Sequence, residues 1–306
     1  MRILLLGGQG QVGHELLTTL RPLGDIIAAT RSGELDDGSR CEVANLADQA
    51  ALDQLLDRIQ PELVVNAAAY TAVDRAEQEV ELADQINHIA LNTIGEWAVA
   101  HRALVIHYST DYVFDGSARS PYHENDATAP LGVYGRSKLA GEQALRASNA
   151  KHFIFRTAWV YGARGGNFLR TMLRVGAERD ELRIVDDQVG TPTSAHLIAS
   201  RTVQVMKRWL KLDENDREQA LGTYHLTSSV PCSWFDFAGA IFDEARTAGL
   251  IERAPKLTPI PSSEYPTPAR RPAWSVLDNA KLALVFGLPA PAWRDGLRDV
   301  IAGMGS

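Results

Sequence analysis

The sequence predicts an α/β fold in which a parallel sheet is covered by helices on both faces and followed by a smaller α/β domain. Two observations support this prediction. Short apolar runs alternate with segments of helical period through the first half of the chain, which is the pattern of βαβ units. A glycine-rich loop, Gly7–Gly13, directly follows the first apolar run and opens the first helical segment, as in Rossmann-type doubly wound sheets.

The individual elements follow in order along the chain. Arg2–Leu6 is apolar, short and stopped by two glycines, so we expect a strand. In Asp48–Ile59 leucines recur at spacings of three and four, which predicts a helix. The Leu-Val-Val core of Glu62–Asn66 is typical of a strand buried on both faces. The remaining predicted strands are Asp25–Ala29, Leu104–Tyr108 and Phe153–Phe155, and the remaining helices are Gln11–Leu20, Glu79–Ala100 and Leu131–Ser148.

The regular alternation loosens after about residue 155. Thr191–Thr193 and the proline-rich Pro259–Pro272 are expected to form long loops, whereas Ala195–Leu210, Trp234–Ala248 and Ala292–Ala302 have helical character. We expect residues 1–155, with roughly 195–226 returning to them, to form a dinucleotide-binding domain. Residues 156–194 and 227–306 then form the smaller substrate domain. A single large domain with a cap is the alternative.

Composition and charge exclude several classes of protein. The 306 residues carry a formal net charge of −7, which repels nucleic acid and anionic membranes. No stretch approaches the ~20 apolar residues of a membrane span, and the apolar opening is too short for the core of a signal peptide. Cys41 and Cys232 stand far apart without metal-ligand spacing, which favours reduced thiols. We therefore expect a cytoplasmic protein with no nucleic-acid or membrane partner.

The spacing of Gly7, Gly10 and Gly13 predicts a dinucleotide site. The first glycine permits a tight turn, the second lets a pyrophosphate approach the backbone, and the third allows the helix to pack closely on the strand. Gln11 and Val12 open that helix, whose N-terminal amides favour phosphate. Tight turns without a ligand also use glycine, and it is the position between strand and helix that favours a cofactor.

The residue that follows the second strand suggests which dinucleotide binds. No acidic residue stands there to hold a ribose 2′-hydroxyl, and Arg31 is suited to a 2′-phosphate instead. We therefore expect NADPH, with NADH as the alternative; an exposed loop arginine is the other interpretation of Arg31. Further candidates for this site are Asn45 and Leu46, at the end of a short third strand, and the small residues Ala67, Ala68 and Ala69 after the fourth. These alanines also suit close helix packing.

Tyr134 and Lys138 stand four residues apart in a predicted helix, so their side chains share one face. A free phenol has a pKa near ~10, and acid–base work at neutral pH needs its phenolate stabilised by about 3 units, roughly 4 kcal/mol. A fixed cation in a site shielded from water supplies this stabilisation. Such pairs also occur on solvated helix surfaces, but the glycine loop and the upstream Ser109–Asp111 strand end favour a catalytic pair.

Further motifs extend along nearly the whole chain. They are Asn66–Asp74, His107–Phe114 and Tyr134–Lys138 in the first half, and Phe155–Tyr161, Asp186–Thr193 and Tyr265–Pro272 in the second. Together with the glycine loop they resemble the extended short-chain dehydrogenase/reductase superfamily and, within it, the dTDP-4-dehydrorhamnose reductase family. The later motifs are more specific than the glycine loop, which the whole superfamily shares.

This resemblance implies an oxidoreductase that uses NADPH to reduce the C4 ketone of dTDP-6-deoxy-L-lyxo-4-hexulose to dTDP-L-rhamnose. That reaction is the last step of dTDP-rhamnose synthesis, which supplies polysaccharides such as the O-antigen of lipopolysaccharide. Tyr134 is implied to give a proton to the developing alkoxide and Lys138 to hold the nicotinamide ribose. Thr110 would hydrogen-bond the carbonyl oxygen, and Tyr108 would contact the cofactor.

The resemblance also implies a set of substrate-binding residues for the dTDP-sugar. They are Thr71, Thr110, Asp111, Tyr112, Val113, Trp159, Arg270 and Arg271. Related dehydratases carry Thr-Asp-Glu where this chain has Thr-Asp-Tyr, which disfavours dehydration. Asp111 is expected to accept bonds from sugar hydroxyls or to cap the next turn. Trp159 either packs on the sugar nucleotide or in the core, and Arg270 and Arg271 bind the diphosphate or form surface ion pairs.

Two further residues of these motifs are interpreted as structural or supporting residues. We expect His107, inside a strand, to be a structural histidine and not a catalytic one. Asn87 matches a superfamily asparagine that supports the catalytic lysine, or is an amide on a helix surface.

One departure from the family concerns metal. Some members dimerise through magnesium held by glutamates of both subunits. Glu15 is present here, but His196 stands where those members carry glutamate. We therefore expect no metal site, catalysis without magnesium, and a monomer or a homodimer formed in another way.

Two other functions are compatible with these motifs. A non-catalytic regulatory subunit of a methionine adenosyltransferase-like complex has the same fold, and the intact Tyr134, Lys138 and Thr110 favour an enzyme over it. A reductase or epimerase of another nucleotide sugar shares the first domain, and the Tyr265–Pro272 loop argues against it.

Overall fold

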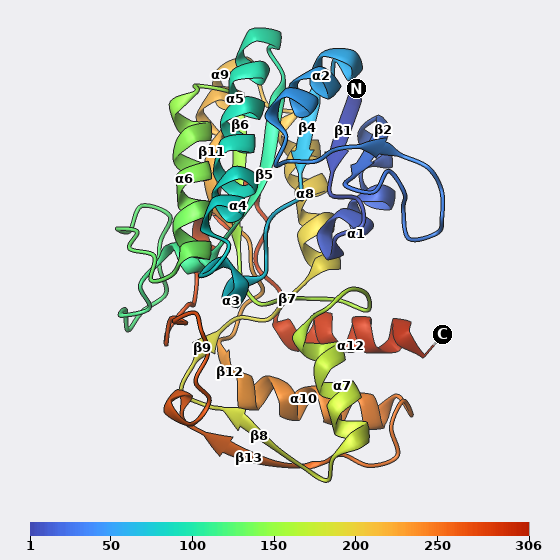
Figure 1. Ribbon diagram of the computed structural model, residues 1–306, viewed down its shortest axis with the longest axis vertical. Helices are drawn as coiled ribbons and strands as arrows, with labels where there is room; N and C mark the ends of the chain where they lie inside the picture. The colour runs from blue at the N-terminus through green and yellow to red at the C-terminus, as the bar shows by residue number, and fades with distance from the viewer. Residues whose placement is uncertain (306) are drawn as a thin grey trace.

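The computed structural model describes residues 1–305, and a parallel sheet of seven strands lies at the centre of this part of the chain (Figure 1). The strand order is β11-β6-β5-β4-β1-β2-β3. The strands are β1 (Arg2–Leu6), β2 (Asp25–Thr30), β3 (Glu42–Val43), β4 (Leu63–Asn66), β5 (Leu104–Thr110), β6 (His152–Thr157) and β11 (Gly222–His225). Because β1 has β2 on one side and β4 on the other, a crevice opens at the carboxyl ends of β1 and β4. The predicted Rossmann-type doubly wound fold is confirmed.

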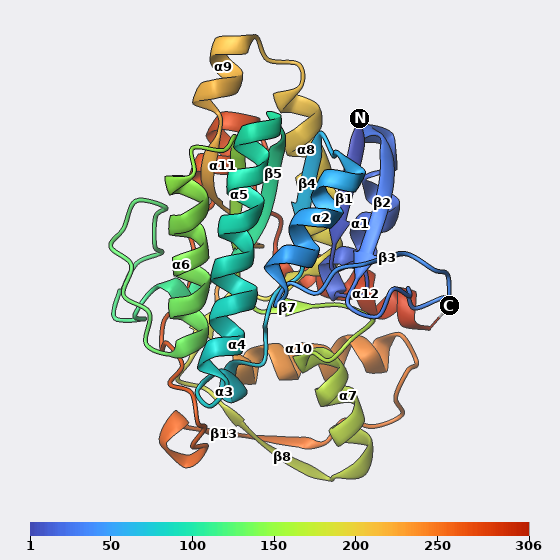
Figure 2. The same ribbon diagram turned by 45° about the horizontal axis from the view of Figure 1, so that its top comes forward.

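Helices cover both faces of this sheet (Figure 2). One face carries α1 (Gln11–Thr19), α8 (Ala195–Trp209) and α11 (Ala280–Phe286), and the other carries α2 (Gln49–Ile59), α5 (Ala90–His101) and α6 (Val133–Ala147). Alternate residues of β1 supply the two cores. Ile3 and Leu5 pack with α1 and α8, whereas Leu4 and Leu6 pack with α2 and α5, and all four are fully buried. Shorter helices are η1 (Arg21–Leu23), α3 (Val73–Ala76) and α9 (Glu214–Gln219).

A smaller domain lies at the carboxyl end of the sheet (Figure 1). Its helices are α7 (Phe168–Glu178), α10 (Trp234–Thr247) and α12 (Trp293–Met304), with the short turn η4 (Ser262–Glu264). Its strands form three pairs: β8 (Glu181–Val185) with β13 (Lys256–Ile260), β7 (Val160–Tyr161) with β10 (Thr193–Ser194), and β9 (Val189–Gly190) with β12 (Cys232–Ser233). A separate apolar core, which includes Phe237 and Leu297, joins these helices and strands.

Two segments differ from the sequence-based expectation. Pro259 and Ile260, predicted to lie in a loop, instead end the strand β13. Proline is tolerated there because β13 pairs on one side only. Strand β5 continues to Thr110, two residues beyond the predicted end, because Ser109 and Thr110 keep pairing with β6.

The long helix predicted over Glu79–Ala100 is interrupted. The chain forms α4 (Val80–Asp84), then a π-helical turn, η2 (Gln85–Ile89), and then α5. The amide of Asn87 causes the interruption: its Oδ1 accepts from the Tyr70 amide at 2.9 Å, and its Nδ2 donates to Ser137 Oγ at 3.0 Å. Asn87 is therefore buried and binds α6, which excludes the surface-amide interpretation.

None of the helices within residues 1–305 is long and apolar enough to cross a membrane.

The contact between η2 and α6 yields a first prediction. A Cβ on Gly141 would lie 2.0 Å from the Asn87 carbonyl oxygen, so Gly141→Ala forces the two helices apart. We expect the free energy of unfolding, measured in urea, to fall by roughly 2–3 kcal/mol. Gly239→Ala in α10 is the matched control, because its Cβ would meet only Leu257 Cδ1 at 4.0 Å. Equal stabilities of the two variants would contradict the close approach.

Candidate active site

The structure has two clefts that the predicted site residues line. The first lies at the carboxyl ends of the sheet strands, has a volume of about 580 Å³, and is lined by the glycine loop, by residues that follow β2 and β4, and by the last part of β5. The second has a volume of about 660 Å³ and lies in the smaller domain, between α7, β8 and the Tyr265–Arg271 segment. Tyr134 and Lys138 line the first cleft, and Arg271 lines the second.

The glycine loop has the geometry of a phosphate cradle. Gly7 has a φ of +85°, and a Cβ on it would lie 2.7 Å from the Ala68 amide nitrogen. A Cβ on Gly13 would lie 2.0 Å from the Gly7 carbonyl oxygen, so α1 packs on the turn as closely as predicted. Gly10 caps α1 without a side-chain hydrogen bond, which leaves the first amides of the helix for an anion. The loop thus fits a dinucleotide pyrophosphate.

The predicted cofactor residues gather around this first cleft. It is lined by Gly7, Gly10, Gln11, Val12, Arg31, Asn45, Leu46, Ala67, Ala68, Ala69, Tyr108, Tyr134 and Lys138. Gly13 lies beneath the loop instead of on the cleft wall. Arg31 is exposed and has no hydrogen bond or ion pair within residues 1–305, so its guanidinium is free to bind a ligand.

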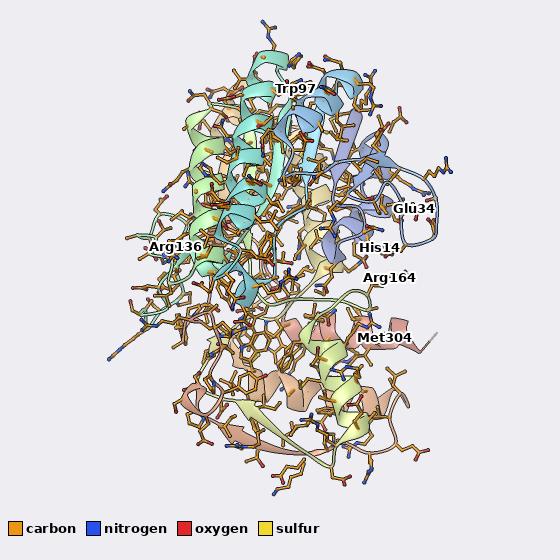
Figure 3. The ribbon with its side chains drawn as sticks, viewed as in Figure 1. His14, Glu34, Trp97, Arg136, Arg164 and Met304 are labelled. Atoms are coloured by element: carbon orange, nitrogen blue, oxygen red, sulfur yellow. The ribbon has the colours of Figure 1, made fainter. Side chains whose placement is uncertain are left out.

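The smaller domain also contributes to the first cleft, through Gly165 and Gly166. Asn167 fixes this loop: its Nδ2 donates to Gln11 Oε1 and to the Gly162 carbonyl, each at 2.9 Å. Arg164, in the same loop, lies at the level where the two domains meet (Figure 3). Gly162–Asn167 was not singled out from the sequence, in which nothing indicated its position over the glycine loop.

Helix α6 places Tyr134 and Lys138 on one face, as their spacing predicts. Lys138 is 1% exposed, and its Nζ donates to the Tyr108 carbonyl at 2.6 Å and lies 3.0 Å from His107 Nε2. Burial lowers the pKa of Lys138 to about 7, while the charge of Glu142 opposes that shift. His107 is buried, as predicted, but it contacts the lysine amine directly.

The phenol of Tyr134 differs from the sequence-based expectation. Burial raises its pKa to about 12; a hydrogen bond with Thr110 lowers the pKa and the Asp111 charge raises it. Lys138 does not stabilise the phenolate here because its amine faces the carbonyl of Tyr108 and the ring of His107. Tyr134 is consequently protonated throughout the physiological range, which is the form that a proton donor requires.

Thr110 and Asp111 meet Tyr134 from the end of β5. Thr110 Oγ1 accepts from the Tyr112 amide at 3.2 Å and donates to Asp111 Oδ1 at 3.0 Å. Asp111 is 2% exposed, and its Oδ2 has no partner within the described chain. Burial raises the pKa of Asp111 to about 6, against the hydrogen bonds from Ser275 and Thr110. The buried Oδ2 can accept a hydrogen bond from a ligand.

A buried ion pair supports the third turn of α6. Glu142 is fully buried, and its carboxylate accepts from Arg156 Nε at 2.9 Å, Arg156 Nη2 at 2.7 Å and Ser109 Oγ at 2.5 Å. Burial favours protonation of Glu142, but the Arg156 bonds outweigh it and hold the pKa of that carboxyl below its usual value. Helix α6 is thereby tied to β5 and β6.

Arg271 links the two clefts. Its Nη2 donates to Asp74 Oδ2 at 2.8 Å, it bonds the Tyr112 hydroxyl, and its buried Nη1 has no partner within the described chain. The Tyr112 ring packs edge-on against Tyr134, with 5.6 Å between centroids. Arg270 was predicted to act with Arg271 but is exposed and lines neither cleft.

Of the other predicted substrate-binding residues, some lie at a cleft and others do not. Thr71 is exposed and lines the first cleft. Trp159 has a φ of +47° and stacks on Trp234 with 3.4 Å between ring centroids, and Trp234 lines the second cleft. Val113 was predicted to bind substrate but is fully buried in a cluster with Phe114, in the turn η3 (Asp111–Val113). The Val113 carbonyl accepts a hydrogen bond from the Ala129 amide, and Val113 lines neither cleft.

Glu15 and His196 face each other on α1 and α8. His196 Nδ1 lies 3.0 Å from Glu15 Oε2, so the imidazole occupies one oxygen of the carboxylate.

Comparisons with known proteins identify the family. The family model described as the RmlD substrate binding domain matches residues 1–305. The chain belongs to this family. A dTDP-4-dehydrorhamnose reductase of Escherichia coli (strain K12) is 44% identical over 301 residues, which cover 98% of this chain and 97% of that protein.

Solved structures agree with this placement in the RmlD family. A dTDP-4-dehydrorhamnose reductase ortholog from Clostridium acetobutylicum has a TM-score of 0.87 and 36% identity, covering 100% of both chains. The Bacillus anthracis dTDP-4-dehydrorhamnose reductase, solved in complex with NADP, has a TM-score of 0.85 and 32% identity, covering 99% of both chains.

The raised pKa of Asp111 yields a prediction for this RmlD-family chain. Between pH ~4 and pH ~6 the Asp111 carboxyl is still protonated in the folded chain but already ionised in the unfolded chain. The free energy of unfolding therefore falls as the pH rises through that window. Asp111→Asn should therefore raise the free energy of unfolding at pH 7.5 by roughly 2–3 kcal/mol and leave it unchanged near pH 3.5.

Urea denaturation at the two pH values measures this difference. Asp115→Asn is the control with the opposite sign, because hydrogen bonds from Ser117 lower the pKa of Asp115. A stability difference for Asp111→Asn that does not change with pH would contradict the assignment.

Proposed function

We propose that this chain is an NADPH-dependent oxidoreductase that reduces the C4 ketone of dTDP-6-deoxy-L-lyxo-4-hexulose to dTDP-L-rhamnose. One arrangement carries the proposal: Tyr134 lines the first cleft together with Lys138, hydrogen-bonds with Thr110, and is connected to the second cleft through Tyr112 and Arg271. A proton donor thus stands between a dinucleotide site and a site for an anionic ligand. The 44% identity to the Escherichia coli dTDP-4-dehydrorhamnose reductase supports the same reaction.

The first cleft is suited to NADPH, which when bound supplies a hydride to the C4 carbon. The amides of the glycine loop and of α1 would hold the pyrophosphate, and the unpaired Arg31 would hold the 2′-phosphate. The Bacillus anthracis relative solved with NADP supports the choice of cofactor. Lys138 would donate to the nicotinamide ribose through an N–H that is not hydrogen-bonded to Tyr108 or His107.

The side chains around Tyr134 manage the proton and the developing charge. Tyr134 donates its hydroxyl proton to the C4 oxygen as the carbonyl becomes an alkoxide. Before substrate binds, the Thr110 hydroxyl donates its one hydrogen bond to Asp111. To donate to the carbonyl oxygen of the substrate, the Thr110 hydroxyl must rotate away from Asp111. Asp111 then keeps its hydrogen bond from Ser275. Oxygen stabilisation of this kind acts most strongly in the transition state.

The second cleft would receive the rest of the sugar nucleotide. Arg271 Nη1 is a buried donor without a partner and suits a diphosphate oxygen. The stacked Trp159 and Trp234 offer a flat apolar surface to the base or the deoxysugar. We accordingly assign NADPH binding to residues 1–155 with roughly 195–226, and sugar-nucleotide binding to residues 156–194 and 227–306.

We further propose a cytoplasmic enzyme that acts as a monomer or homodimer without magnesium. Cys41 and Cys232 are both free thiols, as a reducing compartment requires. The Glu15–His196 contact directs one carboxylate oxygen toward an imidazole instead of a cation.

The reaction is tested directly with the purified chain, NADPH and dTDP-6-deoxy-L-lyxo-4-hexulose. We expect NADPH absorbance to fall with the wild type. Tyr134→Phe should lower kcat by about 10²–10⁴-fold, because the alkoxide loses its proton donor. No NADPH oxidation by the wild type would overturn the function, whereas full activity of Tyr134→Phe would overturn only the role of the phenol.

Cofactor choice is tested at Arg31. Arg31→Asp should lower the ratio of kcat/KM for NADPH to that for NADH by about 10–100-fold, which corresponds to one lost bond between charged groups. Arg40→Asp makes the same charge change on an exposed residue outside the cleft and should leave the ratio near its wild-type value. An unchanged ratio in Arg31→Asp would exclude a 2′-phosphate contact.

A further inference from the structure

Three buried polar side chains form a chain of contacts behind the first cleft. Asn66 ends β4, His107 lies in β5 and Lys138 lies on α6, and each is 1% exposed. Asn66 Nδ2 lies 3.3 Å from His107 Nδ1, and His107 Nε2 lies 3.0 Å from Lys138 Nζ. The proposed reaction assigns no role to Asn66 or His107.

The contacts of Asn66 determine which ring nitrogen of His107 carries the proton. The Ala68 amide donates to Asn66 Oδ1 at 3.2 Å, so the NH₂ group of Asn66 is the side that faces the ring. An amide NH₂ only donates, and His107 Nδ1 must therefore accept. In a neutral imidazole the proton is then on Nε2.

This tautomer constrains Lys138. The Nε2–H of His107 donates toward Lys138 Nζ, and an ammonium has no lone pair to accept it. A neutral amine accepts this bond and still donates to the Tyr108 carbonyl. The lowered pKa values of both residues, for which burial is the main cause, agree with a pair that is mainly neutral at pH 8.

We propose that His107 is a positioning residue that couples the charge of Lys138 to the orientation of the Asn66 amide. Charging the lysine takes up one proton: the Nε2 proton passes to Nζ, and Nδ1 gains a proton. The Asn66 amide must then turn its oxygen to the ring and release the Ala68 amide. Because Ala68 lines the first cleft, the charge of Lys138 is communicated to the backbone of the cofactor site.

Few other charged groups face this chain of contacts. Glu142 on α6 raises the pKa of Lys138, and its partner Arg156 on β6 largely neutralises it. His152 on β6 has a minor electrostatic effect that lowers the pKa of His107. Tyr134 stays protonated because burial raises its pKa to about 12. None of these groups bonds to His107, so the ring and Asn66 control the lysine at close range.

The tautomer of His107 is directly measurable by NMR in protein labelled with ¹⁵N-histidine. We expect the Nε2–H form in the free wild type at pH 8, and its resonances are assigned by their loss in His107→Gln. An Nδ1–H form or an imidazolium at that pH would overturn the proposal, whatever the variants do.

The coupling is measured by titrating Lys138 in protein labelled with ¹³C-lysine. In His107→Gln the side-chain amide can turn its oxygen to Nζ and accept from the ammonium, so the Lys138 titration should move up by about one pH unit. His152→Gln replaces a neighbouring histidine that does not touch Lys138 and should leave the titration in place. Identical titrations in His107→Gln and the wild type would overturn the proposal.

The significance of the coupling for catalysis rests on the proposed function, but neither NMR measurement requires turnover. An inactive chain with the expected tautomer and shift would overturn the reductase function alone. In active protein, His107→Gln should move the limb of the kcat profile that follows the Lys138 titration up by about one pH unit.

Discussion

The position of α6 depends on one buried carboxylate, that of Glu142. Charged donors on β6 and a hydroxyl on β5 converge on it, so the helix has one register against the sheet in which all these bonds form. Removing either member of such a pair leaves an uncompensated buried charge, which costs about 3–5 kcal/mol. Tyr134 stands about two turns before Glu142 on the same helix, and Lys138 stands about one turn before it. Their places at the cleft therefore follow from a bond that takes no part in the chemistry.

Burial is the main influence on the ionisation of several groups at the site. Lys138, Asp111 and Tyr134 all have pKa values shifted toward their neutral forms, with burial as the main cause. The unpaired oxygen of Asp111 and the unpaired nitrogen of Arg271 belong to the same region. Buried polar groups without partners destabilise the folded chain. They are suited to ligand binding because a bound ligand can supply the missing hydrogen-bond partners.

Much of this structure could be predicted from the sequence. The strands and helices of the first domain follow from local periodicity, and the residues of the cofactor cleft follow from the ends of those strands. Tertiary contacts decided the rest. The π-helical turn at Asn87 depends on Tyr70 and Ser137, which are far from it along the chain, and the strand at Pro259 depends on pairing with β8. Val113 and Arg270 line neither cleft, because a motif shows which residues are near a site but not which way each side chain points.

The role of His107 shows the same limit. Its position inside a strand predicted burial, and burial was found. Its partner Lys138 is 31 residues away, and only the packing of α6 on β5 brings the two together. Trp234, Gly165 and Gly166 were not singled out for a similar reason: they are common core or turn residues until the smaller domain is placed against the sheet.

The loop Gly162–Asn167 has a mechanical consequence. It belongs to the smaller domain, yet it bonds Gln11 at the start of α1 and contributes to the wall of the first cleft. A dinucleotide in that cleft would therefore touch both domains at once. Cofactor binding should then raise the free energy needed to separate the two domains, by the free energy of the contacts that the dinucleotide makes with this loop.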